Sequence, residues 1–406
     1  MIALSLLIYS LFLFYSMTSS LDLSIHNIAT NSSNDPKKVW NTVEEHINRL
    51  KRIESSLSIV QTPRYNEARL HAHIYKEGPL RGSSFVIPEH DIHPDAIHAL
   101  IDQGAVPIAE LKTNEDPLDL STFINPWNKR HIAGGSAAAA ISSGGAVFSI
   151  CSDRQGELIL SSNFCGTFGL RPTTSLSKFG WHARTVQDLA HIFSCATGTS
   201  LPEEPPPTSV WYLTDYSPYR LEQSIKNMMH VALKSLQMQT LCFPIDTPLF
   251  SQAFSIWASN WSPPTNYSPN HPTGLMAKMM FERLNHLDPT LGSQLKHIRN
   301  DIKEGLIQLL GEDGVLICPA YPRCVPELSK EHTPMDFVFS AFFCDLGLPA
   351  LHVPMGFCTT GIPLGLQIIA APKQEQHLFA VGQLLEEEFK GWTRSQPFSI
   401  NMPFNP

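Results

Sequence analysis

The chain has 406 residues, of which 43% are hydrophobic and 16% are charged, so it is long enough for a large core and for one or two domains. This composition excludes a disordered protein and a collagen-like one. The 29 basic residues are outnumbered by 37 acidic ones, which gives a net charge of -8. We therefore expect no nucleic-acid partner, because the chain lacks the positive field that attracts phosphate backbones.

Residues 1–20 have the character of a targeting segment. The run from Met1 to Met17 is apolar and is interrupted only by three serines. No Lys or Arg precedes it, Thr18 and Ser20 are small residues at a plausible cleavage spacing, and the run is slightly too short for a transmembrane helix. A signal peptide and a membrane anchor both stay open. An anchor predicts an endomembrane or membrane-anchored protein with membrane association, whereas cleavage predicts a secreted or lumenal one.

The apolar pattern then predicts helices and strands in alternation. Apolar residues at three-to-four residue spacing predict helices over 36–53, 66–75, 95–102, 221–238, 292–310 and 377–389. Short continuous apolar runs predict buried strands over 105–111, 315–318 and 365–370. Prolines crowd residues 201–273, so we expect a loop-rich, peripheral region there. The whole pattern predicts an α/β layered core in a single domain over residues 36–400.

Cysteine and histidine spacing favours structural roles. The eight cysteines occur singly in apolar stretches, without the close pairing of a zinc site or a disulfide scaffold. His71 and His73, and likewise His90, Asp91 and His93, lack the spacing of a metalloprotease motif. We therefore expect no metal and no cofactor.

The most informative stretch runs from Asn125 to Thr173 and is crowded with small residues. Gly134, Gly135 and Ser136 are followed directly by four alanines. Such a run lets a helix begin close to another backbone and leaves amide groups free to face an anion or an oxyanion. Composition alone favours tight helix packing over a catalytic loop.

The order of the motifs in this stretch resembles the amidase signature family. The matching pieces are Asn125-Pro126, Gly134-Gly135-Ser136, Ser152-Asp153 and the run FCGTFGLRPT at 164–173. The runs LGEDGV at 310–315 and FKGW at 389–392, with the apolar N-terminus, are most similar to the fatty-acid amide hydrolase 2 type branch. The resemblance implies a mixed, twisted β-sheet flanked by helices, shortened relative to the family. It also implies a long-chain fatty amide or acyl ligand; dimerisation stays open.

In that family, the resemblance implies a nucleophilic serine, a bridging cis-serine and a lysine base, with an oxyanion hole formed by a glycine turn. Carried over position by position, the cis-serine is Ser136, although Ser136 also fits a second Gly-Gly-Ser copy. The nucleophile position is occupied by Glu157 and the lysine position by Pro88. The oxyanion-hole region reads Arg154-Gln155-Gly156.

Three compact internal losses accompany these substitutions, after Gly82, Ser136 and Gly180. We therefore predict that the family fold is retained, while hydrolysis is absent or very weak. Three alternatives stay open, so whether the chain is an enzyme is undecided. The first alternative is a serine amide hydrolase that acts on fatty-acid amides with an altered site. The second is a non-catalytic lipid or protein binder. The third is a truncated splice or gene-model product.

Overall fold

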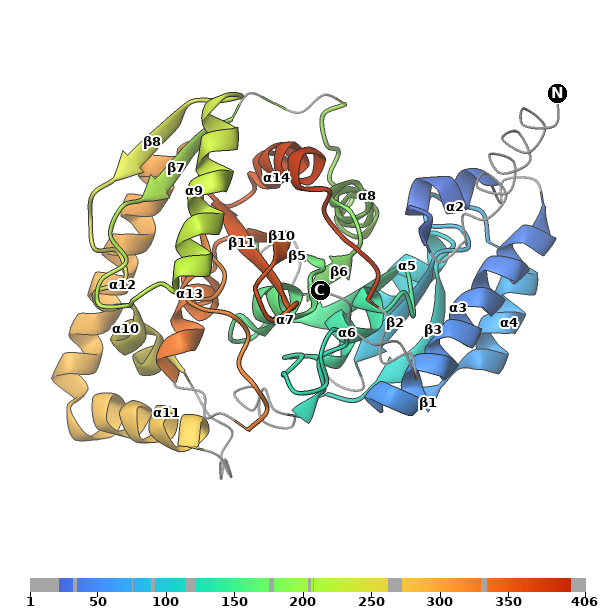
Figure 1. The fold of residues 1–406 in the computed structure, drawn as a ribbon, viewed down its shortest axis with the longest axis horizontal. Coiled ribbons are helices and arrows are strands. Elements are labelled where there is room, and N and C mark those ends of the chain that lie inside the picture. The colour runs from blue at the N-terminus through green and yellow to red at the C-terminus, as the bar shows by residue number, and fades with distance from the viewer. Residues whose placement is uncertain are drawn as a thin grey trace.

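The computed structural model describes residues 22–31, 35–74, 76–88, 92–113, 122–174, 179–203, 206, 208–261, 272–329 and 334–395. The targeting segment predicted over residues 1–20 lies outside the described residues, as do His90 and Asp91. The remaining elements form one continuous α/β body (Figure 1).

One mixed sheet runs through the described part of the chain. Its order is β1-β3-β2-β4-β6-β5-β10-β11-β9-β7-β8. Strand β2 pairs in parallel with β3 and β4, and β7 pairs in parallel with β8 and β9, whereas the pairs in the centre are antiparallel. The predicted α/β class with a mixed sheet is confirmed. The strands are β1 (Val60–Pro63), β2 (Ser84–Pro88), β3 (Val106–Leu111), β4 (Phe148–Ser152), β5 (Phe168–Arg171), β6 (Phe179–Ala183), β7 (Ser209–Leu213), β8 (Cys242–Ile245), β9 (Gly314–Pro319), β10 (Ala350–Phe357) and β11 (Pro363–Ala370).

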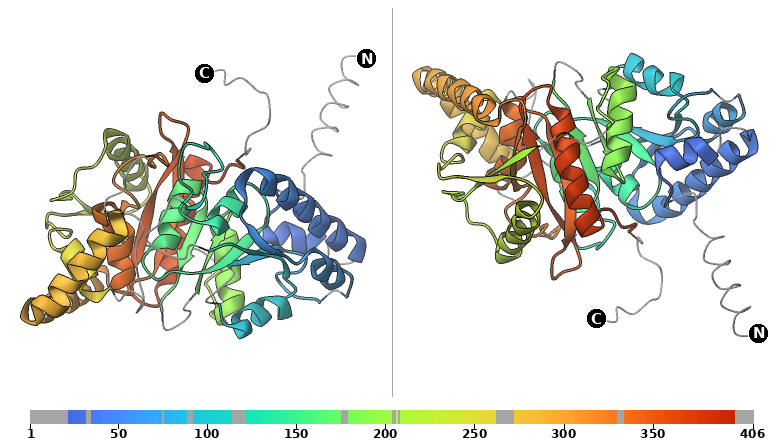
Figure 2. Two further views of the ribbon diagram at one scale, coloured as in Figure 1. Left: turned by 90° about the horizontal axis from the view of Figure 1, so that it is seen from below. Right: turned by 90° about the horizontal axis from the view of Figure 1, so that it is seen from above.

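Helices cover both faces of the sheet. Helices α8 and α14 pack on one face of the central strands, and α7 packs on the other (Figure 2). The helices are α2 (Ile25–Asn31), α3 (Pro36–Leu57), α4 (Tyr65–Ile74), α5 (Pro94–Asp102), α6 (Ser136–Ser142), α7 (Glu157–Cys165), α8 (Val186–Thr197), α9 (Gln223–Gln237), α10 (Ala253–Asn260), α11 (Pro272–Glu282), α12 (Pro289–Leu310), α13 (Pro334–Asp345) and α14 (Glu375–Phe389). A π-helical turn, Arg283–Leu287, joins α11 to α12.

Helix α3 shows how local sequence signals produce an element. The side chain of Asp35 accepts a hydrogen bond from the Lys37 amide, and Pro36 occupies the first turn, where its missing N–H costs nothing. Val43, Ile47 and other apolar residues at three-to-four residue spacing form the buried face. The helix predicted over 36–53 is confirmed, with a further turn at its end.

The segment 201–273, predicted to be loop-rich and peripheral, contains the predicted helix as α9 and also regular elements that were not predicted. It contributes β7 and β8 to one edge of the sheet, and it contains α10, whose Trp257 is buried. Pro244 lies within β8, the outermost strand, where a residue without an N–H breaks no inner ladder. The short apolar strand at 209–213 was not predicted, because the many prolines around it indicate a loop.

Candidate active site

Three distant segments meet at one small cavity of about 90 Å³. Pro88 comes from the end of β2, Ser136 from the start of α6 and Glu157 from the start of α7. Arg154, from the turn before α7, also lines this cavity. The structure therefore brings together the positions that the sequence analysis assigned to the base, the cis-serine and the nucleophile. We call this space the signature cavity.

Small residues allow α6 to approach α7 closely. Gly134 has a φ of +74°, and a Cβ there would lie 3.0 Å from a ring carbon of Phe164. A Cβ on Gly135 would lie 3.2 Å from the Cβ of Ser161. These contacts agree with the helix-packing interpretation of the small-residue run. They also place Ser136, the first residue of α6, at the signature cavity.

The hydroxyl group of Ser136 is engaged with the backbone. Its Oγ donates a hydrogen bond to the carbonyl oxygen of Lys112 over 2.6 Å. A bridging serine has to pass a proton between a base and a nucleophile. In this arrangement the proton of Ser136 points at a carbonyl oxygen, which does not act as a base.

The Glu157 side chain folds back onto the turn that precedes it. One carboxylate oxygen accepts the backbone N–H of Arg154 at 3.0 Å, and the other accepts the N–H of Gln155 at 2.5 Å. Gly156 makes this turn feasible, with a φ of +84°. The two amides of the predicted oxyanion-hole region are therefore already bound by a carboxylate of the same chain.

The electrostatics of this turn are dominated by two neighbouring carboxyl groups. Burial, with the negative charge of Asp153, raises the pKa of Glu157 to about 7. Asp153 forms an ion pair with Arg171, whose guanidinium donates to the carboxylate over 3.0 Å. Both side chains are almost fully buried. Glu157 is thus held chiefly by backbone amides and not by a positive side chain.

Pro88 and Arg154, which line the signature cavity, do not replace the missing lysine. Pro88 has no side-chain proton acceptor, and an arginine side chain such as that of Arg154 carries hydrogen-bond donors only. Lys112 is near Ser136 through its backbone, but its ammonium group donates to the carbonyl and hydroxyl oxygens of Ser58 at 2.9 and 2.8 Å. The described lining of the cavity contains no lysine.

The structure adds a residue that the sequence analysis missed. His182 on β6 lines the cavity, with Nδ1 2.9 Å from the Ser149 hydroxyl and Nε2 3.1 Å from the Ser161 hydroxyl. Burial lowers the pKa of His182 to about 4, so the ring is neutral at neutral pH. The sequence indicated this role of His182 only weakly, since His182 is a single polar residue in a short strand next to a predicted deletion.

Within the described ranges, no three His, Cys, Asp or Glu side chains gather in a way that could hold a metal ion. His71 and His73 lie in the last turn of α4.

Among the residues that the structure describes, no helix is long and apolar enough to cross a membrane.

Comparison with known proteins places this site in a family context. The family model described as Amidase matches residues 95–206, which include Ser136, Glu157 and the run at 164–173. The chain is 35% identical to human fatty-acid amide hydrolase 2 over 103 residues, which are 24% of this chain and 19% of that protein. These two matches support the amidase signature family for this chain. The matched segment thus spans about a fifth of the human relative's length.

Two further relatives match over a longer range. The fatty-acid amide hydrolase 2-B of Danio rerio is 22% identical over 386 residues, covering 78% of this chain and 72% of that protein. The solved structure of 6-aminohexanoate cyclic dimer hydrolase superposes with a TM-score of 0.76 at 16% identity, covering 93% of this chain and 99% of that one. This structural likeness supports the fold of the amidase signature family.

Proposed function

We propose that this chain is an amidase-signature homologue in which serine-dependent amide hydrolysis is absent or very weak. The observation that carries this proposal is the position of the Glu157 carboxylate. It lies on the Arg154 and Gln155 amides, where the family resemblance predicts the oxyanion of the reaction. In its ionised form this group opposes the charge that develops in the transition state, and in either form it occupies the two amides.

The expected loss of activity is large. Loss of a single oxyanion donor reduces kcat by roughly 10² to 10³, and here both amides are occupied. The lysine position is Pro88 and the nucleophile position carries no hydroxyl. Catalytic groups that act as one unit leave little activity once several are missing.

A fluorophosphonate serine-hydrolase probe tests the proposal directly. We expect no labelling of the purified chain under conditions that label an active serine hydrolase. Strong labelling that is lost in Ser136→Ala would overturn the proposal, because Ser136 would then be a nucleophile. Labelling that is lost in Ser161→Ala would also overturn it and would identify the hydroxyl beside His182 as the reactive one.

Restoring a hydroxyl at position 157 tests the loss of the nucleophile separately from the loss of the lysine base. Glu157→Ser replaces the carboxylate by a hydroxyl, and Glu157→Gln serves as the matched control without a nucleophile. We expect neither variant to hydrolyse a long-chain fatty amide, because the lysine base remains absent. Hydrolysis by Glu157→Ser alone would show that Pro88 is not at the lysine position.

The ligand class follows only by analogy with the fatty-acid amide hydrolases. Ligand pockets usually enclose about 300 to 1,000 Å³, whereas the signature cavity holds about 90 Å³. We therefore expect a long-chain fatty amide to leave the melting temperature unchanged. A concentration-dependent rise would instead favour the lipid-binding alternative.

The remaining proposals concern the gene product as a whole. Transcript sequencing across the Gly82, Ser136 and Gly180 junctions tests whether the internal losses are encoded, because exons that restore a lysine and a serine would favour a truncated product. N-terminal sequencing of the mature protein tests cleavage near Thr18 to Ser20. Retention of Met1 in a membrane fraction would favour the anchor.

A further inference from the structure

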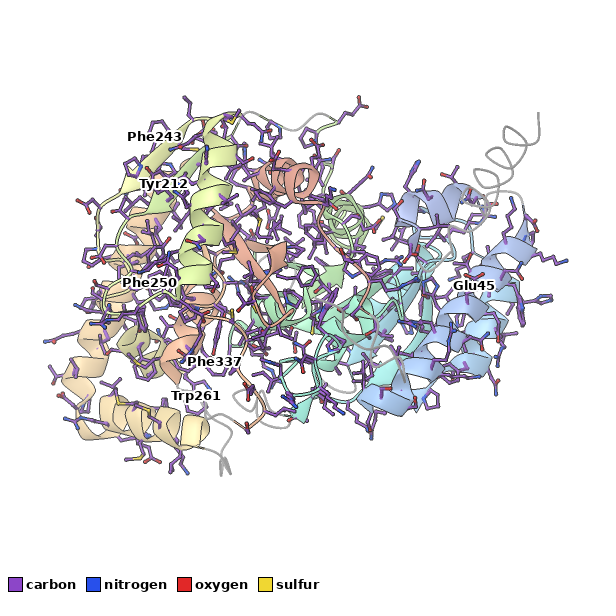
Figure 3. All side chains as sticks on the ribbon, viewed as in Figure 1. Glu45, Tyr212, Phe243, Phe250, Trp261 and Phe337 are labelled. Carbon is purple, nitrogen blue, oxygen red and sulfur yellow. The ribbon has the colours of Figure 1, made fainter. Side chains whose placement is uncertain are left out.

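A larger cavity lies away from the signature cavity, between α9 and the end of β7. It has a volume of about 690 Å³, within the range of small-molecule pockets. Tyr212, at the side of α9 in Figure 3, forms part of its wall. None of its lining residues belongs to the signature cavity. We call it the α9 cavity.

The charged residue types at the rim of the α9 cavity are all basic. Arg220, Lys226 and His230 all contribute to its lining, and no Asp or Glu does so. Lys226 and His230 are four residues apart on α9, so they lie on the same face of the helix. Within the described part of the chain, no carboxylate pairs with any of the three. The rim therefore presents positive charge on a protein whose net charge is -8.

The wall of the cavity is uncharged and combines three tyrosines with aliphatic side chains. Tyr216 and Tyr219 both contact Phe339, with ring centroids 6.3 and 5.5 Å apart. These contacts anchor the tyrosines against a buried aromatic cluster, so their rings form a fixed surface. Burial raises the pKa of Tyr219 to about 12 and also raises that of Tyr216, so both phenols are neutral at neutral pH.

We propose that the α9 cavity binds an amphipathic organic carboxylate with an aromatic body. The tyrosine wall packs against the ring of the ligand, while Arg220 and Lys226 bind the carboxylate at the rim. Arginine recognises carboxylates through paired N–H donors, and lysine adds a point charge. This binding role goes beyond the proposed function, because it uses a separate cavity and requires no catalysis.

Calorimetric titration with 4-phenylbutanoate tests the proposal, and 4-phenylbutan-1-ol is the matched neutral ligand. We expect the carboxylate to bind with one-to-one stoichiometry, and the alcohol to bind at least about tenfold more weakly. Exposed ion pairs contribute up to about fivefold each, so Arg220→Gln with Lys226→Gln should weaken carboxylate binding about tenfold. Lys234→Gln, an exposed lysine on α9 outside the cavity lining, should bind as the unmodified chain does.

Three outcomes would overturn this proposal. Equal binding of the alcohol would show that the basic rim does not select a carboxylate. Equal losses in Lys234→Gln and in the double variant would show a general charge effect and not a site. Absence of 4-phenylbutanoate binding to the unmodified chain would exclude the predicted ligand class.

Because all three basic side chains are exposed, the double variant is expected to fold. Glu157→Ser should not change this titration, so the result is independent of the catalytic test.

Discussion

Replacement of Gly156 by alanine tests whether the turn before α7 is held in place by packing. Gly156 has a φ of +84°, and an added Cβ would lie 2.6 Å from the carbonyl carbon of Ser340 and 2.7 Å from the amide nitrogen of Ala341. Both contacts are with the backbone of α13, so no side-chain rotation relieves them. The substitution must shift either the turn or α13.

Gly198 provides a matched control, since it also has a positive φ, of +69°, but nothing lies within 4 Å of an added Cβ. A non-glycine residue in the left-handed region costs about 1 to 2 kcal/mol, partly offset by reduced freedom of the unfolded chain. We therefore expect Gly198→Ala to cost about 1 kcal/mol. Overpacking adds about 1 to 3 kcal/mol at Gly156, so Gly156→Ala should cost about 2 to 4 kcal/mol.

Urea unfolding of the two variants measures this difference in the free energy of unfolding. We expect the midpoint of Gly156→Ala to fall well below that of Gly198→Ala, with similar slopes. The reasoning would be refuted if the two substitutions were equally costly. That result would mean that the turn yields freely, and the amides bound by Glu157 would then have no fixed geometry.

The remaining predictions concern buried charges. Arg171→Met should lower the free energy of unfolding by about 3 to 5 kcal/mol in urea, because it leaves the Asp153 carboxylate buried without its cation. Asp153→Asn added to this variant should recover part of the loss, and a double variant no more stable than the single one would contradict the argument. Burial lowers the pKa of His182 to about 4 and lowers those of His46 and His352 to about 3, so the unfolded chain takes up these protons first and stability should fall from about pH 6.5 down to about pH 3. The raised pKa of Glu157, about 7, offsets part of this fall above about pH 4.5. Urea midpoints across this range measure the effect; His182→Asn should flatten the dependence, and an unchanged slope would exclude His182 as a contributor.

Elements with a local signature were predicted well. The strand expected over 105–111 is β3, and the helix expected over 377–389 is α14, which begins two residues earlier at Glu375. Apolar periodicity is a property of neighbouring residues, so it is readable without a fold. Strand β8 was missed because it pairs only at the sheet edge, with β7, and because Pro244 within it signals a loop when no partner is known.

The residues of the candidate site also differ in how far they could be predicted from the sequence. From the order of the motifs alone, Pro88, Ser136 and Glu157 could be assigned to positions in the family pattern. His182 could not, since its significance arises only when β6 brings it beside Ser149 and Ser161. Residue identity is local, whereas the neighbours of a side chain depend on strand pairing across the sheet.

What the sequence by itself determined is which chemical groups are present: a proline and a carboxylate stand where the family resemblance predicts a lysine and a serine. The tertiary structure decided what the carboxylate does. It could have pointed into solvent or toward a cation, but Arg171 is paired with Asp153 and the turn offers two backbone N–H groups within reach. The backbone amides of Arg154 and Gln155 bind the acceptor that the same turn supplies, which is Glu157.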